Sequence, residues 1–427
     1  MSSSHRGFRS RGFARRIGRG HSGERRLDGN ADSEQILELP AIQIIDLPRD
    51  GANTKEEDIY VSDVKSLGSY NRMDEWTLTI VVPGHPRIWL DRSMPYNVPP
   101  DVGPPSHGNA RCKFEHFVMF PLFVAVDRLV QDEGRDPVDW PSVDFVTDRN
   151  NLRKLLRWIL GKDDHKTFRI DLQLAGDRTV IMAIWAGDQH RRPILYQRTQ
   201  QRRNGYGFNF EKESTKSYPG LERSLEYDRV IQYNMSGLNL VVRFEVDGCI
   251  LPTEGNSGSS GSGEGPSVLS AESELSEQLS SMHLSTPAPP SLTRSFNVVG
   301  GGASVPESCI LEVTTAKNVH WEEQYPQIFF SQTPHHISAQ HVESYFYAMD
   351  RTHISSPKLQ AVNKKLQPEL KKLRRFLGHL QELVILHGKG QRLSLVYGGD
   401  KKMRLFRMKN DVCCVPEEFL TRFSTTT

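Results

Sequence analysis

The chain has 427 residues, of which 37% are hydrophobic and 25% charged, and its formal net charge is +2. This length allows two or three domains, or one large domain with insertions, and the composition supports a packed core. The longest apolar run, 117–126, spans about ten residues, whereas a membrane-spanning helix needs about twenty, so we expect no membrane contact. No apolar signal-peptide core follows Met1. The five cysteines form no CxxC pair, which favours a reducing compartment and argues against structural zinc.

The N-terminal segment 1–35 is predicted to be a disordered tail. Residues 1–26 hold eight arginines against Glu24 alone, interleaved with glycines and two phenylalanines. The rest of the chain carries 46 basic and 51 acidic residues, so the basic excess lies in this segment. Arginine binds phosphates and aromatic rings stack on bases, so we interpret it as an RNA-binding or nuclear-import arm. This favours the nucleus, with the cytoplasm as a second location. A purely solubilising tail fits equally well, and the glycines disfavour the helix of a mitochondrial presequence.

Strand and helix signals alternate in the segment that follows. Two hairpins are expected, around Gly176-Asp177 and Ser236-Gly237. The predicted elements are a strand at 76–82, a helix at 150–160, and strands at 168–174, 179–185, 229–233 and 238–247.

A Ser/Gly/Pro-rich stretch, 253–306, is expected to be a flexible insertion, because it offers too little apolar surface to offset the entropy of ordering. A strand at 310–314, a leucine-rich helix at 358–387 and a last strand at 392–397 follow. Pro368 is expected to break or kink that helix. The prediction is therefore one α/β (α+β) domain, 36–252 and 307–427, with a mixed central sheet flanked by helices.

Acidic residues interrupt apolar segments at three places. Glu245 and Asp247 are two residues apart, which puts them on one face of a strand. Glu312 lies within ILEVTT, and Glu211 follows two aromatic residues in GFNFEK. A single such acid is more often a surface charge. Three in consecutive strand or strand-edge segments predict a site for divalent cations, Mg²⁺ or Mn²⁺, because paired carboxylates repel each other unless a cation intervenes.

The order of motifs resembles the DXO decapping nuclease family, whose fold belongs to the PD-(D/E)XK nucleases. The resemblance spans roughly 69–406, and the segments that carry it are VTDRNNLRKLL, GFNFE, FEVD, LEVT and YPQIFF. It implies metal ligands at Glu211, Asp247 and Glu312, and substrate-binding residues at Arg149 and Gln327. It implies catalytic roles for Glu245, Asp247 and Glu312, and Lys317 is the candidate for the catalytic lysine.

The sequence departs from this pattern at Thr314, where the family has lysine. Threonine supplies no positive charge to a reacting phosphate. Lys317 is the nearest lysine in sequence, but three residues along a strand is an odd step, which needs a bulge to reach the same face. His335, His336 and His341 lack a zinc spacing, so we expect ordinary polar or loop histidines there.

The resemblance implies a metal-dependent hydrolase of RNA 5′ ends in mRNA quality control, acting by decapping or pyrophosphohydrolysis and as a 5′–3′ exonuclease. The alternative is a catalytically impaired pseudonuclease that binds RNA or a partner exoribonuclease. For Arg149, the alternative is a solvated position on a basic helix face. The sequence does not predict an oligomeric state.

Overall fold

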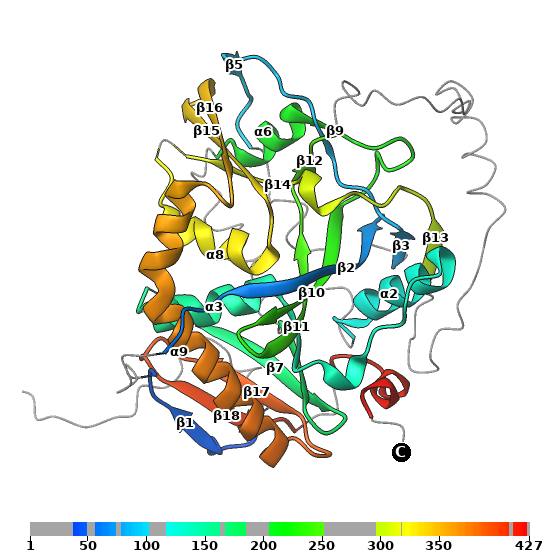
Figure 1. Cartoon of the computed structure of the whole chain (residues 1–427), viewed down its shortest axis with the longest axis vertical. Helices are drawn as coiled ribbons and strands as arrows, with labels where there is room; N and C mark the ends of the chain where they lie inside the picture. The colour runs from blue at the N-terminus through cyan, green and yellow to red at the C-terminus, as the bar shows by residue number, and fades with distance from the viewer. Residues whose placement is uncertain are drawn as a thin grey trace, which may run out of the picture.

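The computed structural model describes residues 37–48, 56–73, 78–101, 117–162, 167–184, 205–251, 296–316, 318–409 and 413–424. The arginine-rich tail, residues 253–295 of the expected insertion and Lys317 lie outside these residues. Strands form two mixed sheets, and helices pack on them (Figure 1). No helix in the described ranges combines the length and apolarity that a membrane crossing needs.

The larger sheet contains the two predicted hairpins. Its strands, in spatial order, are β1 (Gln43–Ile45), β18 (Met403–Arg407), β17 (Leu393–Tyr397), β7 (Phe168–Ala175), β8 (Thr179–Ile184), β6 (Phe145–Asp148), β11 (Leu238–Glu245), β10 (Glu226–Met235), β2 (Val61–Arg72), β3 (Thr79–Val82) and β13 (Asn297–Gly300). The hairpins β7–β8 and β10–β11 are antiparallel, and β6 lies parallel to both β8 and β11 between them. This arrangement confirms a mixed sheet.

The smaller sheet was not expected as a separate unit. Its strands, in spatial order, are β5 (Tyr96–Asn97), β16 (Tyr345–His353), β15 (His335–Val342), β14 (Ile310–Thr315), β12 (Gly248–Cys249), β4 (Ile88–Trp89) and β9 (Thr215–Lys216). β11 of the larger sheet and β12 of the smaller one are consecutive along the chain, so Val246 and Asp247 connect the two sheets.

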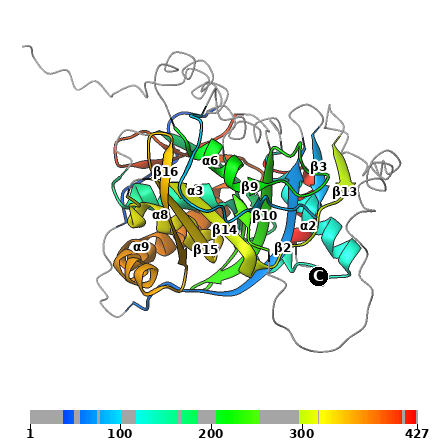
Figure 2. The ribbon, with the colours of Figure 1, turned by 90° about the horizontal axis from the view of Figure 1, so that it is seen from above.

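Helices cover both faces of the larger sheet. The helices of the described residues are α2 (Phe120–Glu133), α3 (Arg149–Ile159), α6 (Gly207–Ser214), α8 (Trp321–Ser331) and α9 (Pro357–His387), and of these α6 packs against β14 and β9 of the smaller sheet. Figure 2 shows α8 and α9 on one side of β2 and β10, and α2 on the other. The leucines of α9 pack into the main apolar core with α3 and α8, whereas Phe123 of α2 lies in a second core on the opposite face.

Several sequence predictions differ from the structure in detail. α9 is one helix of 31 residues, so of the two outcomes expected at Pro368, a break or a kink, the break does not occur, because the buried leucines pack along both halves. Residues 297–300, assigned to the flexible insertion, form β13 and pair with β3 in parallel. The strand at 392–397 is followed by β18 and by a 3₁₀ helix, Glu417–Phe423.

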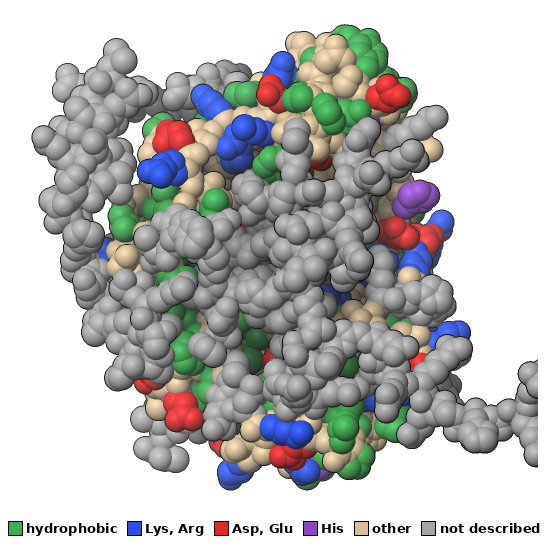
Figure 3. Space-filling view, turned by 180° about the vertical axis from the view of Figure 1, so that it is seen from behind, with side chains coloured by type: hydrophobic (Ala, Val, Ile, Leu, Met, Phe, Trp, Pro, Cys, Tyr) green, Lys and Arg blue, Asp and Glu red, His purple; other side chains and the backbone are tan. Residues whose placement is uncertain are grey.

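The surface carries charges of both signs. On the face opposite to that of Figure 1, basic and acidic side chains lie intermixed along the edges (Figure 3). This agrees with the near balance of charge in the sequence that follows the tail.

Candidate active site

The predicted acids converge at the junction of the two sheets. Glu245 is the last residue of β11, and Asp247 follows in the connection to β12. β12 pairs with β14, and the Asp247 Oδ2 atom accepts a hydrogen bond from the backbone N–H of Val313 at 2.7 Å. This bond holds Asp247 beside Glu312, the preceding residue of β14.

Glu211 reaches the same region from a helix. Asp101 accepts hydrogen bonds from the backbone N–H groups of Asn209, at 2.9 Å, and Phe208, at 3.4 Å, and so stabilises the N-terminus of α6. α6 packs against β14, which carries Glu312. The strand or strand-edge position expected for Glu211 is therefore wrong.

The expectation that Glu245 and Asp247 share one face of a strand is also wrong. The pairing of β11 with β10 ends at Glu245, opposite Asp228, and the chain then turns toward the smaller sheet. Asp247 approaches the other acids because of this turn rather than through strand alternation.

The acids repel one another, which shows in their pKa values. Burial raises the pKa of Asp247 well above its ordinary value, and the charges of Glu312 and Glu211 raise it further. Burial raises the pKa of Glu211 to about 8, with contributions from Glu245, Glu312 and Asp101, while Arg87 opposes the shift. A concentration of carboxylates of this kind attracts protons or cations.

Both predicted substrate-binding residues contact Glu312. The Arg149 Nη1 atom donates to Oε2 of Glu312 at 2.7 Å, and both side chains are buried. The Gln327 Nε2 atom, from α8, donates to Oε1 of the same carboxylate. Arg149 is therefore not the solvated residue of the alternative interpretation.

The chemistry of the donor set suits a hard divalent cation, because Glu211, Glu245, Asp247 and Glu312 offer only oxygen atoms. Within the described part of the chain, however, no group of three or more acids, histidines and cysteines is arranged to hold a metal ion. The contacts of Glu312 give a physical reason, since both of its oxygens accept hydrogen bonds from protein donors. Cation binding at Glu312 has to compete with those contacts.

Thr314, where the resemblance implies a lysine, lies next to a histidine. The Nε2 atom of His336 lies 3.1 Å from the Thr314 hydroxyl oxygen. His336 is buried and packs edge-on against the Trp321 ring, and its Nδ1 has no hydrogen-bond partner among the described residues. Burial lowers the pKa of His336 to about 4, although Glu312 opposes the shift, so the imidazole is neutral at pH 7. A neutral pair thus occupies the position where the resemblance to the decapping nucleases implies a lysine.

The other two histidines are ordinary polar residues, as expected. His335 lies 2.9 Å from the carbonyl oxygen of Ser308, and His341 lies 2.8 Å from that of Glu343.

Two cationic residues near the acids were not predicted. Arg87 donates to the hydroxyl oxygens of Thr215, at 2.6 Å, and Ser217, at 2.7 Å, and its charge acts on Glu211. Arg153 lies on α3, one turn beyond Arg149, and interacts electrostatically with Glu312. Arg153 lies in the helix that the sequence predicts to be basic. Its position four residues after Arg149 was the signal that the two side chains lie on the same side of that helix.

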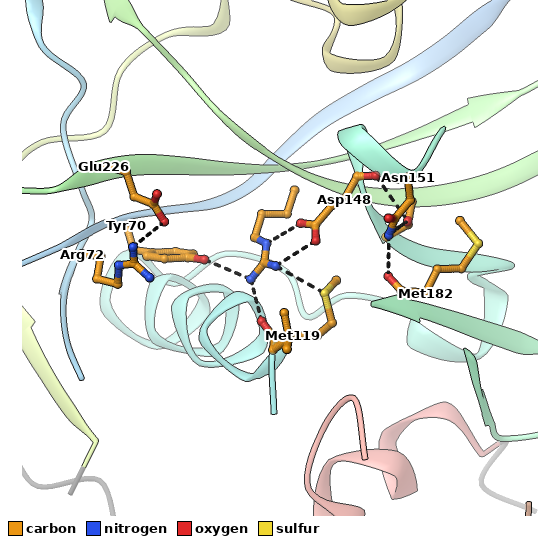
Figure 4. Close-up of polar contacts among 10 residues, drawn as sticks. Tyr70, Arg72, Met119, Asp148, Asn151, Met182 and Glu226 are labelled. Atoms are coloured by element: carbon orange, nitrogen blue, oxygen red, sulfur yellow. Dashed lines mark hydrogen bonds and ion pairs between the residues drawn. The ribbon is translucent and has the colours of Figure 1, made fainter. Parts of the chain in front are cut away.

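A buried ion pair anchors the start of α3. Asp148 is the residue before Arg149, and its carboxylate binds Arg243 of β11 through two contacts of 2.7 and 3.1 Å. Arg243 also donates to the carbonyl oxygen of Val118 at 2.9 Å. Figure 4 shows Asp148 facing this guanidinium group, with Tyr70 and Met119 nearby. The pair joins β6, β11 and the segment before α2, and so fixes the backbone that carries Arg149.

Comparisons with known proteins agree on the fold. Rai1 of Candida albicans, solved in complex with pU5-Mn²⁺, is 14% identical, with a TM-score of 0.54 over 90% of this chain and 99% of that chain. Rai1 of Scheffersomyces stipitis, solved with (3′-NADP)⁺ and calcium ion, is 11% identical, with a TM-score of 0.52 over 87% of this chain and 99% of that chain. The resemblance to the decapping nucleases is thereby confirmed for the fold, and the low identity marks a divergent chain. No curated protein matches the sequence. A model described as a domain of unknown function, DUF8563, matches residues 42–423, and the chain belongs to this family.

Proposed function

We propose that this protein is a divalent-cation-dependent hydrolase of RNA 5′ ends, which removes caps or pyrophosphate and then degrades RNA 5′ to 3′. The observation that carries the proposal is the convergence of Glu211, Glu245, Asp247 and Glu312 beside Arg149. Rai1 of Candida albicans, which has the same fold, was solved with pU5 and manganese, and this supports RNA and a divalent cation as ligands.

The roles follow from the contacts. Glu211, Asp247 and Glu312 would hold Mg²⁺ or Mn²⁺, which polarises the phosphoryl oxygen and lowers the pKa of bound water. Arg149 and Gln327 donate to Glu312 in the free protein, and the same donors suit phosphate oxygens. Glu245 adds negative charge to the cluster and so favours cation uptake.

A second candidate is a pseudonuclease that binds RNA, or an exoribonuclease partner, without turnover. The neutral contact between Thr314 and His336 favours it, because removing one electrostatic contact to a transition state commonly costs about a hundred- to a thousandfold in rate. For both candidates we propose a nuclear location, on the basis of the arginine-rich sequence 1–26.

One assay distinguishes the two candidates. Purified full-length protein is incubated with 5′-triphosphate, NAD-capped and unmethylated-cap RNAs, with and without Mn²⁺, and the products are resolved by chromatography. The hydrolase releases nucleotides or cap fragments only with Mn²⁺, and Asp247→Asn and Glu211→Gln abolish the release. Glu213→Gln is the matched control, because Glu213 lies on the same helix but is exposed and pairs with Arg92. Binding of these RNAs without any product identifies the pseudonuclease.

A further inference from the structure

Arginines recur at four-residue spacing on α3. Arg149, Arg153 and Arg157 therefore lie on one side of the helix, on successive turns. Arg149 begins the row, where its guanidinium group contacts Glu312. Arg153 follows about 6 Å farther along the helix axis, at the usual rise per residue.

Arg153 interacts electrostatically with Glu312 but makes no direct ion pair with a carboxylate of the described residues. No hydrogen bond or ion pair joins its partly buried side chain to another residue in the described ranges. Burial lowers its pKa to about 10, and repulsion from Arg149 lowers it further, while Glu312 opposes the shift. At pH 7 the group is still charged. The nearby carboxylate of Glu312 already accepts hydrogen bonds from Arg149 and Gln327.

A positive charge held partly out of water beside a second one is unfavourable for the free protein. An anionic ligand removes that cost. The planar guanidinium group donates two parallel hydrogen bonds to a phosphate, and this geometry makes arginine the usual partner of phosphate groups.

We propose that Arg153 forms a phosphate-binding subsite next to the carboxylate site and contacts a phosphate group of the RNA other than the one that is attacked. The choice of RNA as the ligand rests on the proposed function. One helical turn separates Arg153 from Arg149 along α3, so in this proposal the two arginines bind different phosphate groups of one ligand.

The test measures RNA binding by fluorescence anisotropy with labelled pentauridylates that carry a 5′-triphosphate, a 5′-monophosphate or a 5′-hydroxyl. Calcium replaces manganese, and a gel checks that the probe stays intact. Arg153→Gln is expected to weaken binding of the phosphorylated probes at least tenfold, because a hydrogen bond between charged groups is lost. The slope of log affinity against log salt should fall by about 0.7, the value for one contact to a single strand.

Lys154→Gln is the matched control. It removes the same charge from the next position of the same helix, where the Lys154 ammonium lies over the Phe168 ring, 5.7 Å from its centroid. Its affinity should stay within twofold of wild type. A loss confined to probes with a 5′-phosphate assigns the subsite to the terminal phosphates, and an equal loss for all three probes assigns it to an internal phosphate.

Thermal unfolding without RNA separates binding from a structural role. Arg153→Gln should leave the melting temperature unchanged or raise it, because it removes a partly buried charge that forms no direct ion pair within the described residues. Arg153→Lys keeps the charge and should retain part of the affinity. Wild-type affinity in Arg153→Gln, an equal loss in Lys154→Gln, or a lowered melting temperature would each overturn the proposal. If RNA binding depends on Arg153 but the wild type releases no product, the subsite stands and the hydrolase proposal fails.

Discussion

Arg149 donates to Glu312 across 2.7 Å, and Gln327 donates to the other oxygen of the same carboxylate. A residue expected to bind substrate is thus the ion-pair partner of a residue expected to bind metal. Cation binding at Glu312 and phosphate binding at Arg149 both require this pair to open. The two ligands should therefore bind cooperatively, because each one frees the group that the other needs.

Replacing Arg149 should change the affinities for Mn²⁺ and for RNA in opposite directions. In Arg149→Met, Glu312 loses its positive neighbour, so the affinity for Mn²⁺ should rise several-fold, measured by isothermal titration calorimetry. RNA affinity should fall at least tenfold, because a hydrogen bond to a charged group is lost. Arg128→Met, which removes an exposed ion pair with Asp132, should change neither. Weaker Mn²⁺ binding in Arg149→Met would contradict this interpretation of the pair.

The raised pKa of Glu211 predicts how stability depends on pH. Its value of about 8 in the folded protein lies above the ordinary 4.5, so the folded state holds a proton that the unfolded state releases. Without metal, the free energy of unfolding should therefore fall as the pH rises from about 4.5 to 8. Glu211→Gln should flatten this slope in urea denaturation, and Glu213→Gln should not. Since Mn²⁺ binds ionised carboxylates, it should stabilise the protein more at pH 8 than at pH 5. A stability that rises with pH in both variants would count against the acid cluster.

The contact between Thr314 and His336 predicts how a positively charged side chain can be introduced at position 314. A lysine at 314 needs the space that the His336 ring fills, 3.1 Å from the threonine hydroxyl. We expect Thr314→Lys with His336→Ala to raise kcat for RNA hydrolysis at least tenfold, toward the hundred- to thousandfold of one electrostatic contact. Thr314→Lys alone should give less, because the imidazole still occupies the space. A double variant that hydrolyses RNA at the wild-type rate would show that another group already supplies the charge.

Hairpins and helices were predictable because their signals are local. Gly176, with a φ of 58°, and Gly237, with a φ of 87°, occupy the left-handed positions that a tight turn needs, and each lies where the sequence indicates one. The alternating apolar residues on both sides complete the pattern. For α9, the leucine repeat predicted the helix, and packing of both halves keeps the helix continuous through Pro368.

The candidate site was predictable only as a set of residues. The sequence identified Glu245, Asp247 and Glu312 as candidates because they are acidic residues within apolar segments. It did not predict the turn after Glu245 or the pairing of β12 with β14, because both depend on contacts between residues distant in sequence. The contact of Arg149 with Glu312 joins residues 163 positions apart, and no local pattern encodes it. The same holds for Arg153, because its lack of a direct ion pair within the described residues depends on the fold.

The buried pair of Arg243 and Asp148 leads to a prediction about stability. Both side chains are at most 3% exposed, so Asp148→Asn removes the carboxylate that the buried Arg243 guanidinium group binds directly. This change should lower the free energy of unfolding by about 3–5 kcal/mol, measured by urea denaturation. The double variant Arg243→Met with Asp148→Leu removes both charges and should recover much of that loss. Asp400→Asn breaks an exposed pair with Arg404 and should cost less than about 1 kcal/mol. Because Asp148 precedes Arg149, Asp148→Asn should also weaken RNA binding. Equal stabilities of Asp148→Asn and Asp400→Asn would show that the pair of Arg243 and Asp148 does not anchor α3.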